Sequence, residues 1–241
     1  MPPFNQTPDQ PQSFGYKTLW FSIKTSDPAL VVDAFESDLA TPANWASSLA
    51  AAYSNSGSQA PGPWVFVSPP INGWVLATCA QFPYPVTIDA HHDIGRKFDV
   101  LFSRLMKRFD DVQFFGSHRV VDFATWARSR GGKPVRVFGF ADGEVLANLG
   151  EQTAEDARLG FVNLSGMPPA DACEKIFAAM EESDIDEDQA SEQEDSRDAI
   201  PDENDVIDLA ALWSIDPTQL SEQDHPPGLG FAVRLPNNLT Q

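Results

Sequence analysis

Two of the four histidines stand beside carboxylates in one short polar segment. Asp89, His91, His92 and Asp93 are residue types that ligate Zn²⁺, Mn²⁺ or Fe²⁺. Adjacent histidines on a strand would point to opposite faces, however, and no second cluster of histidine and carboxylate completes a ligand set. We therefore interpret the segment as a polar loop in which Asp93 caps the following helix, and we expect no metal or other cofactor.

A serine, a histidine and an aspartate also occur close together, at Ser117, His118 and Asp122. The sequence contains no nucleophile elbow, and sequence neighbours seldom adopt the geometry in which a base reaches its nucleophile. His118 and Arg119 are equally well suited to be a recognition pair at the end of a strand. Residues 139–143 are not a dinucleotide-binding fingerprint, because they lie in a predicted hairpin. No catalytic residue is assigned.

Acidic residues are concentrated in one segment. Residues 181–205 hold 13 carboxylates and one arginine, a net charge of −12 out of −19 for the whole chain. Asp184, Asp186 and Asp188 alternate like the first ligands of an EF-hand, but Gln189 stands where the calcium loop needs glycine. The segment is therefore predicted to be a solvated linker that stays extended by self-repulsion.

Composition limits the class of protein. Hydrophobic residues make up 42% of the 241 residues, with 17 Phe and 6 Trp, which predicts a packed core. No apolar run approaches the roughly 20 residues of a membrane span, and residues 1–12 lack a secretory signal pattern, so we expect a cytoplasmic protein. The excess of acid over base disfavours nucleic acid and membrane partners. Cys79 and Cys173 are predicted to be buried thiols.

The segment from 98 to 149 contains the clearest element signals. Apolar residues at spacings of three and four predict a helix over 95–109, and residues 112–115 are typical of a buried strand. Residues 121–130 are interpreted as a short helix capped by Asp122 and stopped by two glycines. Asp142-Gly143 between alternating runs predicts a hairpin over 133–148.

The other predicted elements complete an α+β domain. Helices are expected at 28–35, 41–53, 168–180 and 205–213, and strands at 16–24, 64–68, 74–79 and 229–235. The fold class predicted is α+β, with helices packed against an antiparallel sheet. We expect a disordered arm at 1–15 and a single domain over 16–241, interrupted by the acidic linker at 181–201.

The order of five segments carries a resemblance to known proteins. These segments are 64–79, 98–109, 111–132, 135–161 and 205–220. Together they resemble a group of poorly characterised bacterial proteins that occur beside polymorphic or type VI secreted toxins and are suspected to be their immunity proteins. The resemblance covers residues 64–220 apart from the acidic tract. It implies a class of function and no catalytic residue.

Three functions from different classes are compatible with these observations. The first is a cytoplasmic immunity protein without enzymatic activity, which neutralises a cognate basic toxin by occluding its active site; acidic groups on a rigid sheet suit such a partner. The second is a hydrolase or metal-dependent enzyme centred on His91, His92 and His118. The third is an acidic adaptor of a secretion system. The sequence favours the first and specifies no oligomeric state. The predicted toxin-binding residues are Asp89, His91, His92, Asp93, His118, Arg119, Asp142 and Glu144.

Overall fold

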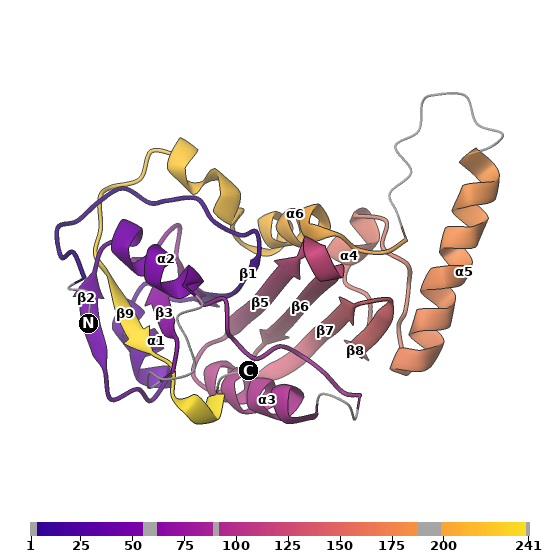
Figure 1. Cartoon of the computed structure of the whole chain (residues 1–241), viewed down its shortest axis with the longest axis horizontal. Coiled ribbons are helices and arrows are strands. Elements are labelled where there is room, and N and C mark those ends of the chain that lie inside the picture. Colours follow the sequence, from indigo (N-terminus) through magenta and orange to yellow (C-terminus); the bar gives the residue numbers. More distant parts are fainter. Residues whose placement is uncertain (1–3, 55–61, 89–91, 188–198, 240–241) are drawn as a thin grey trace.

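One antiparallel sheet forms the centre of the molecule. The computed structural model describes residues 4–54, 62–88, 92–187 and 199–239, and within them nine strands pair in the order β2-β9-β3-β4-β1-β5-β6-β7-β8 (Figure 1). The strands are β1 (Thr18–Lys24), β2 (Ala40–Ala43), β3 (Trp64–Val67), β4 (Trp74–Thr78), β5 (Asp111–His118), β6 (Phe123–Arg130), β7 (Lys133–Ala141), β8 (Glu144–Gly150) and β9 (Gly230–Arg234). The predicted α+β class is confirmed.

Helices connect and cover the strands. They are α1 (Pro28–Ala34), α2 (Trp45–Tyr53), α3 (His92–Met106), α4 (Ala154–Arg158), α5 (Pro169–Glu187) and α6 (Glu203–Trp213), with short 3₁₀ turns η2 (Arg119–Val121), η3 (Pro217–Glu222) and η4 (Asn237–Leu239). In the described part of the chain, none of them combines the length and the apolarity needed to cross a membrane.

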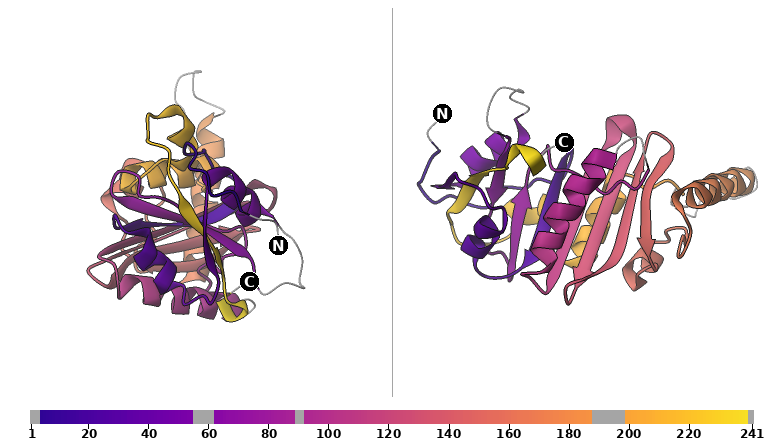
Figure 2. Two further views of the ribbon diagram at one scale, coloured as in Figure 1. Left: turned by 90° about the vertical axis from the view of Figure 1, so that its left-hand side faces the viewer. Right: turned by 90° about the horizontal axis from the view of Figure 1, so that it is seen from below.

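Each face of the sheet has its own hydrophobic layer. Alternate residues of a strand point to opposite sides, so Phe21 joins the layer with α1 and α3, whereas Trp20 joins the layer with α2 and α6. The pairing of β1 with β5 extends both layers, because Phe21 lies opposite Phe114 and Trp20 opposite Phe115. Figure 2 shows α3 and α6 on opposite sides of the strands.

The prediction of a short helix at 121–130 is wrong, because residues 123–130 form strand β6, which lies between β5 and β7 in the sheet. Phe123 and Ala127 face the α3 side, and Ala124 and Trp126 face the α6 side. Both faces are buried, so the strand lacks the alternation of polar and apolar residues that would have revealed it. The two glycines that follow are a hairpin turn with φ of 56° and 74°, and not a helix stop.

Most other predicted elements are confirmed, with one difference in the first third of the chain. The predicted helix at 41–53 begins only at Trp45, and residues 40–43 form the edge strand β2. Asn44 is the N-cap of α2, since its side chain accepts a hydrogen bond from the Ser47 N–H (3.1 Å). The prediction placed the start signal at Pro42, one turn too early.

The N-terminal arm, expected to be disordered, contacts the body of the protein from Phe4 onward. The Phe4 ring packs edge-on against Trp64, with centroids 4.8 Å apart. Asp9 accepts hydrogen bonds from the Trp45 N–H (2.8 Å) and the Ala46 N–H (3.0 Å). The arm thus supplies a carboxylate that caps α2 in addition to the Asn44 amide.

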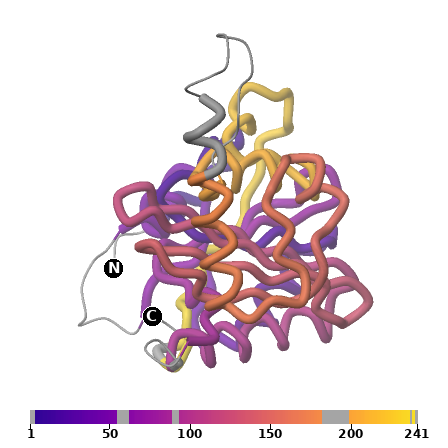
Figure 3. Tube along the Cα trace, turned by 90° about the vertical axis from the view of Figure 1, so that its right-hand side faces the viewer, coloured from indigo at the N-terminus to yellow at the C-terminus, as the bar shows by residue number. Residues whose placement is uncertain are grey.

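The two edges of the sheet are protected differently. β2 is short and contains Pro42, which blunts that edge. At the other edge, the Leu146 carbonyl of β8 accepts hydrogen bonds from the Thr87 N–H (2.8 Å) and hydroxyl (3.1 Å). Helix α5 stands beyond β8 (Figures 1 and 3). The β8 edge is therefore covered by a helix and a loop.

Helix α5 extends into the segment predicted to be an acidic linker. It continues through Glu187, beyond the predicted end at residue 180. Residues 188–198, which form most of the predicted linker at 181–201, lie outside the described residues.

Candidate functional site

Three elements meet at the turn between β7 and β8. Asp142 and Gly143 have φ of 49° and 82°, the left-handed pair that a tight two-residue hairpin needs. The Asp142 N–H donates to the Val121 carbonyl of η2 (3.2 Å), and the Cys173 thiol of α5 donates to the Gly143 carbonyl (3.2 Å). The turn therefore fixes η2 on one side and α5 on the other.

An open groove of about 750 Å³ lies between α5 and the start of β8, and we call it the α5 groove. Its apolar lining residues are Ile88, Val145, Pro169, Ala170, Cys173, Phe177 and Ala178, and its acidic lining residues are Glu144, Glu174 and Glu181. The volume falls within the range of about 300–1,000 Å³ that is usual for ligand sites. Viewed from this end of the molecule, α5 stands in front of the strands (Figure 3).

The groove combines exposed apolar surface with acidic side chains. Phe177 keeps 39% of its surface exposed, although Ala172 and Ile176 of the same helix are buried against the sheet. Glu144, Glu174 and Glu181 are exposed, and none has an ion-pair partner among the described residues. Such a surface suits a partner that offers apolar side chains and cations together.

A second hollow, of about 480 Å³, lies on the η2 side, and we call it the η2 pocket. Arg119 lines it and stands 3.8 Å from Glu203 at the start of α6. Met180 of α5 also lines it, so α5 contributes to both hollows. Val120 of η2 is 71% exposed. The surface that carries apolar and charged side chains therefore extends from the α5 groove to η2.

Four of the predicted toxin-binding residues come together at this end of the sheet. His118 ends β5, Arg119 begins η2, Asp142 occupies the hairpin turn, and Glu144 begins β8 and lines the α5 groove. The strand register explains the grouping, because His118 pairs with Phe123 and the neighbouring Ala124 pairs with Phe140.

The other four predicted residues surround the start of α3. Asp89 and His91 lie outside the described residues, and His92 begins α3 without a described side chain. Asp93 is exposed and forms ion pairs with Arg96 (2.7 Å) and Lys97 (2.6 Å). Hydrogen bonds from these two cations lower the pKa of Asp93 to about 2. Asp93 therefore stabilises the first turns of α3 locally and is not a free carboxylate.

The geometry does not assemble a Ser-His-Asp triad at 117–122. The Ser117 hydroxyl is buried and donates to the Gly15 carbonyl (3.5 Å). Ser117 and His118 are successive residues of β5, whose side chains point to opposite faces. Asp122 has φ of 43° in the turn before β6.

Metal-ligating residues do not converge within the described ranges either. No group of three or more His, Cys, Asp or Glu side chains there is placed to hold a metal ion. Cys79 and Cys173 are free thiols. Burial raises the pKa of Cys79 to about 12, so the thiol stays protonated and inert.

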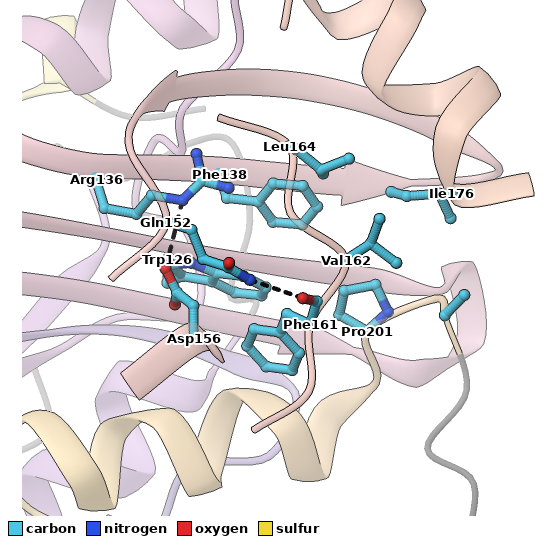
Figure 4. Close-up of a pocket in the computed structure, with 11 residues that line it drawn as sticks. Trp126, Arg136, Phe138, Gln152, Asp156, Phe161, Val162, Leu164, Ile176 and Pro201 are labelled. Carbon is cyan, nitrogen blue, oxygen red and sulfur yellow. Dashed lines mark hydrogen bonds and ion pairs between the residues drawn. The ribbon is translucent and has the colours of Figure 1, made fainter. Parts of the chain in front are cut away.

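A smaller hollow above β6 and β7 is lined by a buried ion pair (Figure 4). Arg136 and Asp156 are 4% and 2% exposed, and the Arg136 Nε lies 3.6 Å from the Asp156 Oδ2. Burial raises the pKa of Asp156, and hydrogen bonds from Thr153 together with the charge of Arg136 oppose that shift. The space is about 20 Å³, which admits roughly one water and no substrate.

This ion pair belongs to a network that holds α4 on the sheet. Arg128 and Arg136 lie directly opposite each other on β6 and β7, which is unfavourable for like charges. Asp111 compensates Arg128 through two hydrogen bonds (2.7 and 3.3 Å), and Asp156 of α4 compensates Arg136. We therefore interpret the hollow of Figure 4 as structural.

Sequence reasoning missed most of the α5 groove. The predicted helix at 168–180 included Cys173 and Phe177 as ordinary core residues, and Glu174 and Glu181 were not singled out. The available signal was the width of the apolar stripe. Ala172 and Ile176 already form a buried stripe, so the stripe through Cys173 and Phe177 is additional.

Comparisons with known proteins identify no relative, because no family model matches the chain and neither the curated proteins nor the solved structures include a match to it.

Proposed function

We propose that this protein is an immunity protein, which binds a cognate basic toxin through the α5 groove and neutralises it by occlusion. The observation that carries the proposal is an exposed apolar groove whose three glutamates have no cationic partner among the described residues. A solvent-exposed Phe177 beside unpaired carboxylates is a feature of interfaces, where an aromatic anchor contributes affinity and charge contributes orientation.

Charge supports a basic partner. The chain carries a formal charge of −19. Within it, Glu144, Glu174 and Glu181 form a local acidic rim along the groove. Complementary charge raises association rates to about 10⁸ M⁻¹s⁻¹ or more at low salt. A toxin that acts on nucleic acid or nucleotides commonly has a basic cleft, so an acidic inhibitor that binds there also blocks access to it.

In this mechanism the chain inhibits by binding alone and catalyses no reaction. The groove is built on a hairpin turn and a helix that are hydrogen-bonded to each other through Cys173, so it is largely preformed. Affinity would come from desolvating the Phe177 ring and from pairing the glutamates with lysine or arginine. Binding should therefore weaken as salt rises, while the apolar contribution remains.

Co-purification tests the proposal. The tagged full-length chain is isolated from its native host at low and at high salt, and retained proteins are identified by mass spectrometry. We expect one stoichiometric basic protein whose toxic activity falls when the chain is added back. If no partner is retained at either salt, or if the retained protein keeps its full activity, the proposal is wrong.

A further inference from the structure

We infer that the occupant of the α5 groove is an amphipathic basic helix, rather than an extended strand or a loop of the partner. This inference rests on the proposed function for its biological setting. Its physical argument rests on the spacing of the groove residues, on the state of the β8 edge and on the thiol of Cys173.

The apolar residues of α5 that line the groove have helix-pairing spacing. Ala170, Cys173 and Phe177 stand at i, i+3 and i+7, so they form one seam along two turns of α5. This is the spacing with which one helix packs its apolar side chains into the holes of another. Ile88 and Val145 form the opposite apolar wall. A second helix laid along this seam would contact both walls.

The two glutamates of α5 that line the groove also have a spacing that suits a partner helix. Glu174 and Glu181 are seven residues apart, which places them on the same side of α5 and about 10.5 Å apart along its axis. A partner helix presents lysine or arginine at i and i+7 with the same separation. A strand rises about 3.3 Å per residue, so it covers that distance in about three residues, which point to alternating faces. The acidic rim therefore favours a helix.

The edge of the sheet disfavours the main alternative. A strand would bind here by extending the sheet at β8, through free backbone groups. The Leu146 carbonyl already accepts two hydrogen bonds from Thr87, and α5 stands against β8. Since the Leu146 carbonyl is occupied and α5 packs beside the strand, β8 is a poor template for a further strand at this position, and side chains are the more suitable source of binding energy, as when a helix fills a groove.

Cys173 provides a direct readout of groove occupancy in the unmodified chain. Its thiol lines the groove and is partly exposed, whereas Cys79 is fully buried. In the native protein an alkylating reagent should therefore react at Cys173 alone. A helix lying on the seam covers this thiol and slows the reaction.

The test measures the rate of Cys173 alkylation in the full-length protein with three synthetic peptides of about 18 residues, long enough to form a helix. The first has leucines at helical spacing flanked by lysines. The second has the same composition with a central proline that breaks the helix, and the third alternates leucine and lysine as a strand does. We expect only the first to slow alkylation, by about tenfold at ten times its Kd.

Two charge variants separate specific from general attraction. In E174K/E181K the first peptide should lose its protective effect, whereas in E222K/D224K, which has the same change of charge outside the groove, it should keep it. The inference is overturned if the helical peptide leaves the rate unchanged, if the three peptides protect equally, or if E174K/E181K is protected like the wild type.

The peptide assay and the co-purification test separate claims, so a negative result in one does not imply a negative result in the other. A partner that is retained by the wild type and lost by E174K/E181K, together with an unprotected Cys173 in the peptide assay, supports the proposed function and contradicts the helical occupant. Protection by the helical peptide without any retained partner supports the helical occupant and contradicts the immunity role.

Discussion

The α5 groove and the outward face of α3 are two open surfaces of similar size and opposite charge. The α3 face is defined by Arg96, Asp99, Val100, Ser103, Arg104, Lys107 and Arg108, which with Glu36 line a hollow of about 600 Å³. The α5 groove encloses about 750 Å³. In size and exposure either surface qualifies as an interaction site.

Their charges are balanced in different ways. On the α3 face, Arg96 pairs with Asp93 and Arg104 pairs with Glu36 (3.0 Å), while Lys107 and Arg108 follow the end of α3, where the helix dipole favours cations. The glutamates of the α5 groove have no such partners in the described chain, and they border apolar side chains. Local partners and the helix dipole account for the cations of the α3 face, whereas the glutamates beside the exposed Phe177 have neither among the described residues; this contrast is the reason for proposing that the α5 groove binds a partner.

The largest effect is expected at a residue that fixes α3 in place. A Cβ at Gly95 would overlap the Val86 carbonyl oxygen, so Gly95→Ala must displace either α3 or the backbone at Val86 that packs against it. We expect the free energy of unfolding to fall by about 3 kcal/mol in urea titrations. Val100→Ala, on the exposed side of the same helix, should change it by less than about 0.5 kcal/mol. If the two substitutions lowered the free energy of unfolding equally, the close contact between Gly95 and Val86 would not be what positions α3.

Charge reversal compares the two surfaces directly. E174K/E181K should weaken binding of the co-purified partner by about 100-fold, or about 2.7 kcal/mol, because repulsion replaces attraction at the rim. K107E/R108E on the α3 face should leave Kd within about threefold. Titration calorimetry of both variants against one partner preparation gives the comparison. A larger loss in K107E/R108E would assign binding to the α3 face instead.

Two single substitutions compare apolar side chains of similar exposure. Phe177 is 39% exposed and Val100 is 44% exposed. Phe177→Ala should weaken partner binding by about 2 kcal/mol, close to 30-fold, and Val100→Ala should not change it measurably. Neither should lower the unfolding free energy by more than about 1 kcal/mol. If both variants bind like the wild type, Phe177 is not an anchor.

The smallest effect concerns the ion pairs at the start of α3. The pKa of Asp93 is about 2 in the folded protein, below its ordinary 3.8, so its contribution to stability is present above pH 3.8 and lost as the pH falls to 2. Asp93→Asn should be slightly less stable than the wild type at pH 7 and equally stable below pH 2. Urea titrations across this range give the difference, and a difference that does not change with pH would contradict the assignment.

Element types were predictable from the sequence wherever one local signal dominated. The Asp142-Gly143 turn and the apolar stripe of α3 gave correct predictions because turn chemistry and helical periodicity act over a few residues. β6 was not predictable, since Phe123, Trp126 and Ala127 match helical spacing and also the two buried faces of a strand.

The candidate site was predictable only in part, for a related reason. Glu144 and Asp142 were identified through their hairpin, and the sheet register then brought His118 and Arg119 beside them. The groove itself depends on where α5 lies relative to β8, which is a tertiary property. The width of the apolar stripe on α5 indicates that part of it stays uncovered, but the local sequence does not specify that Phe177 is the exposed residue and Ile176 the buried one.

Hydrogen exchange of the full-length chain, alone and with its co-purified partner, tests the central claim most directly. We predict that partner binding slows exchange in residues 169–181 of α5 and at the β7–β8 turn, and leaves exchange in residues 96–106 of α3 unchanged. Slower exchange across α3 with no change in α5 would contradict the assignment of the α5 groove as the binding surface.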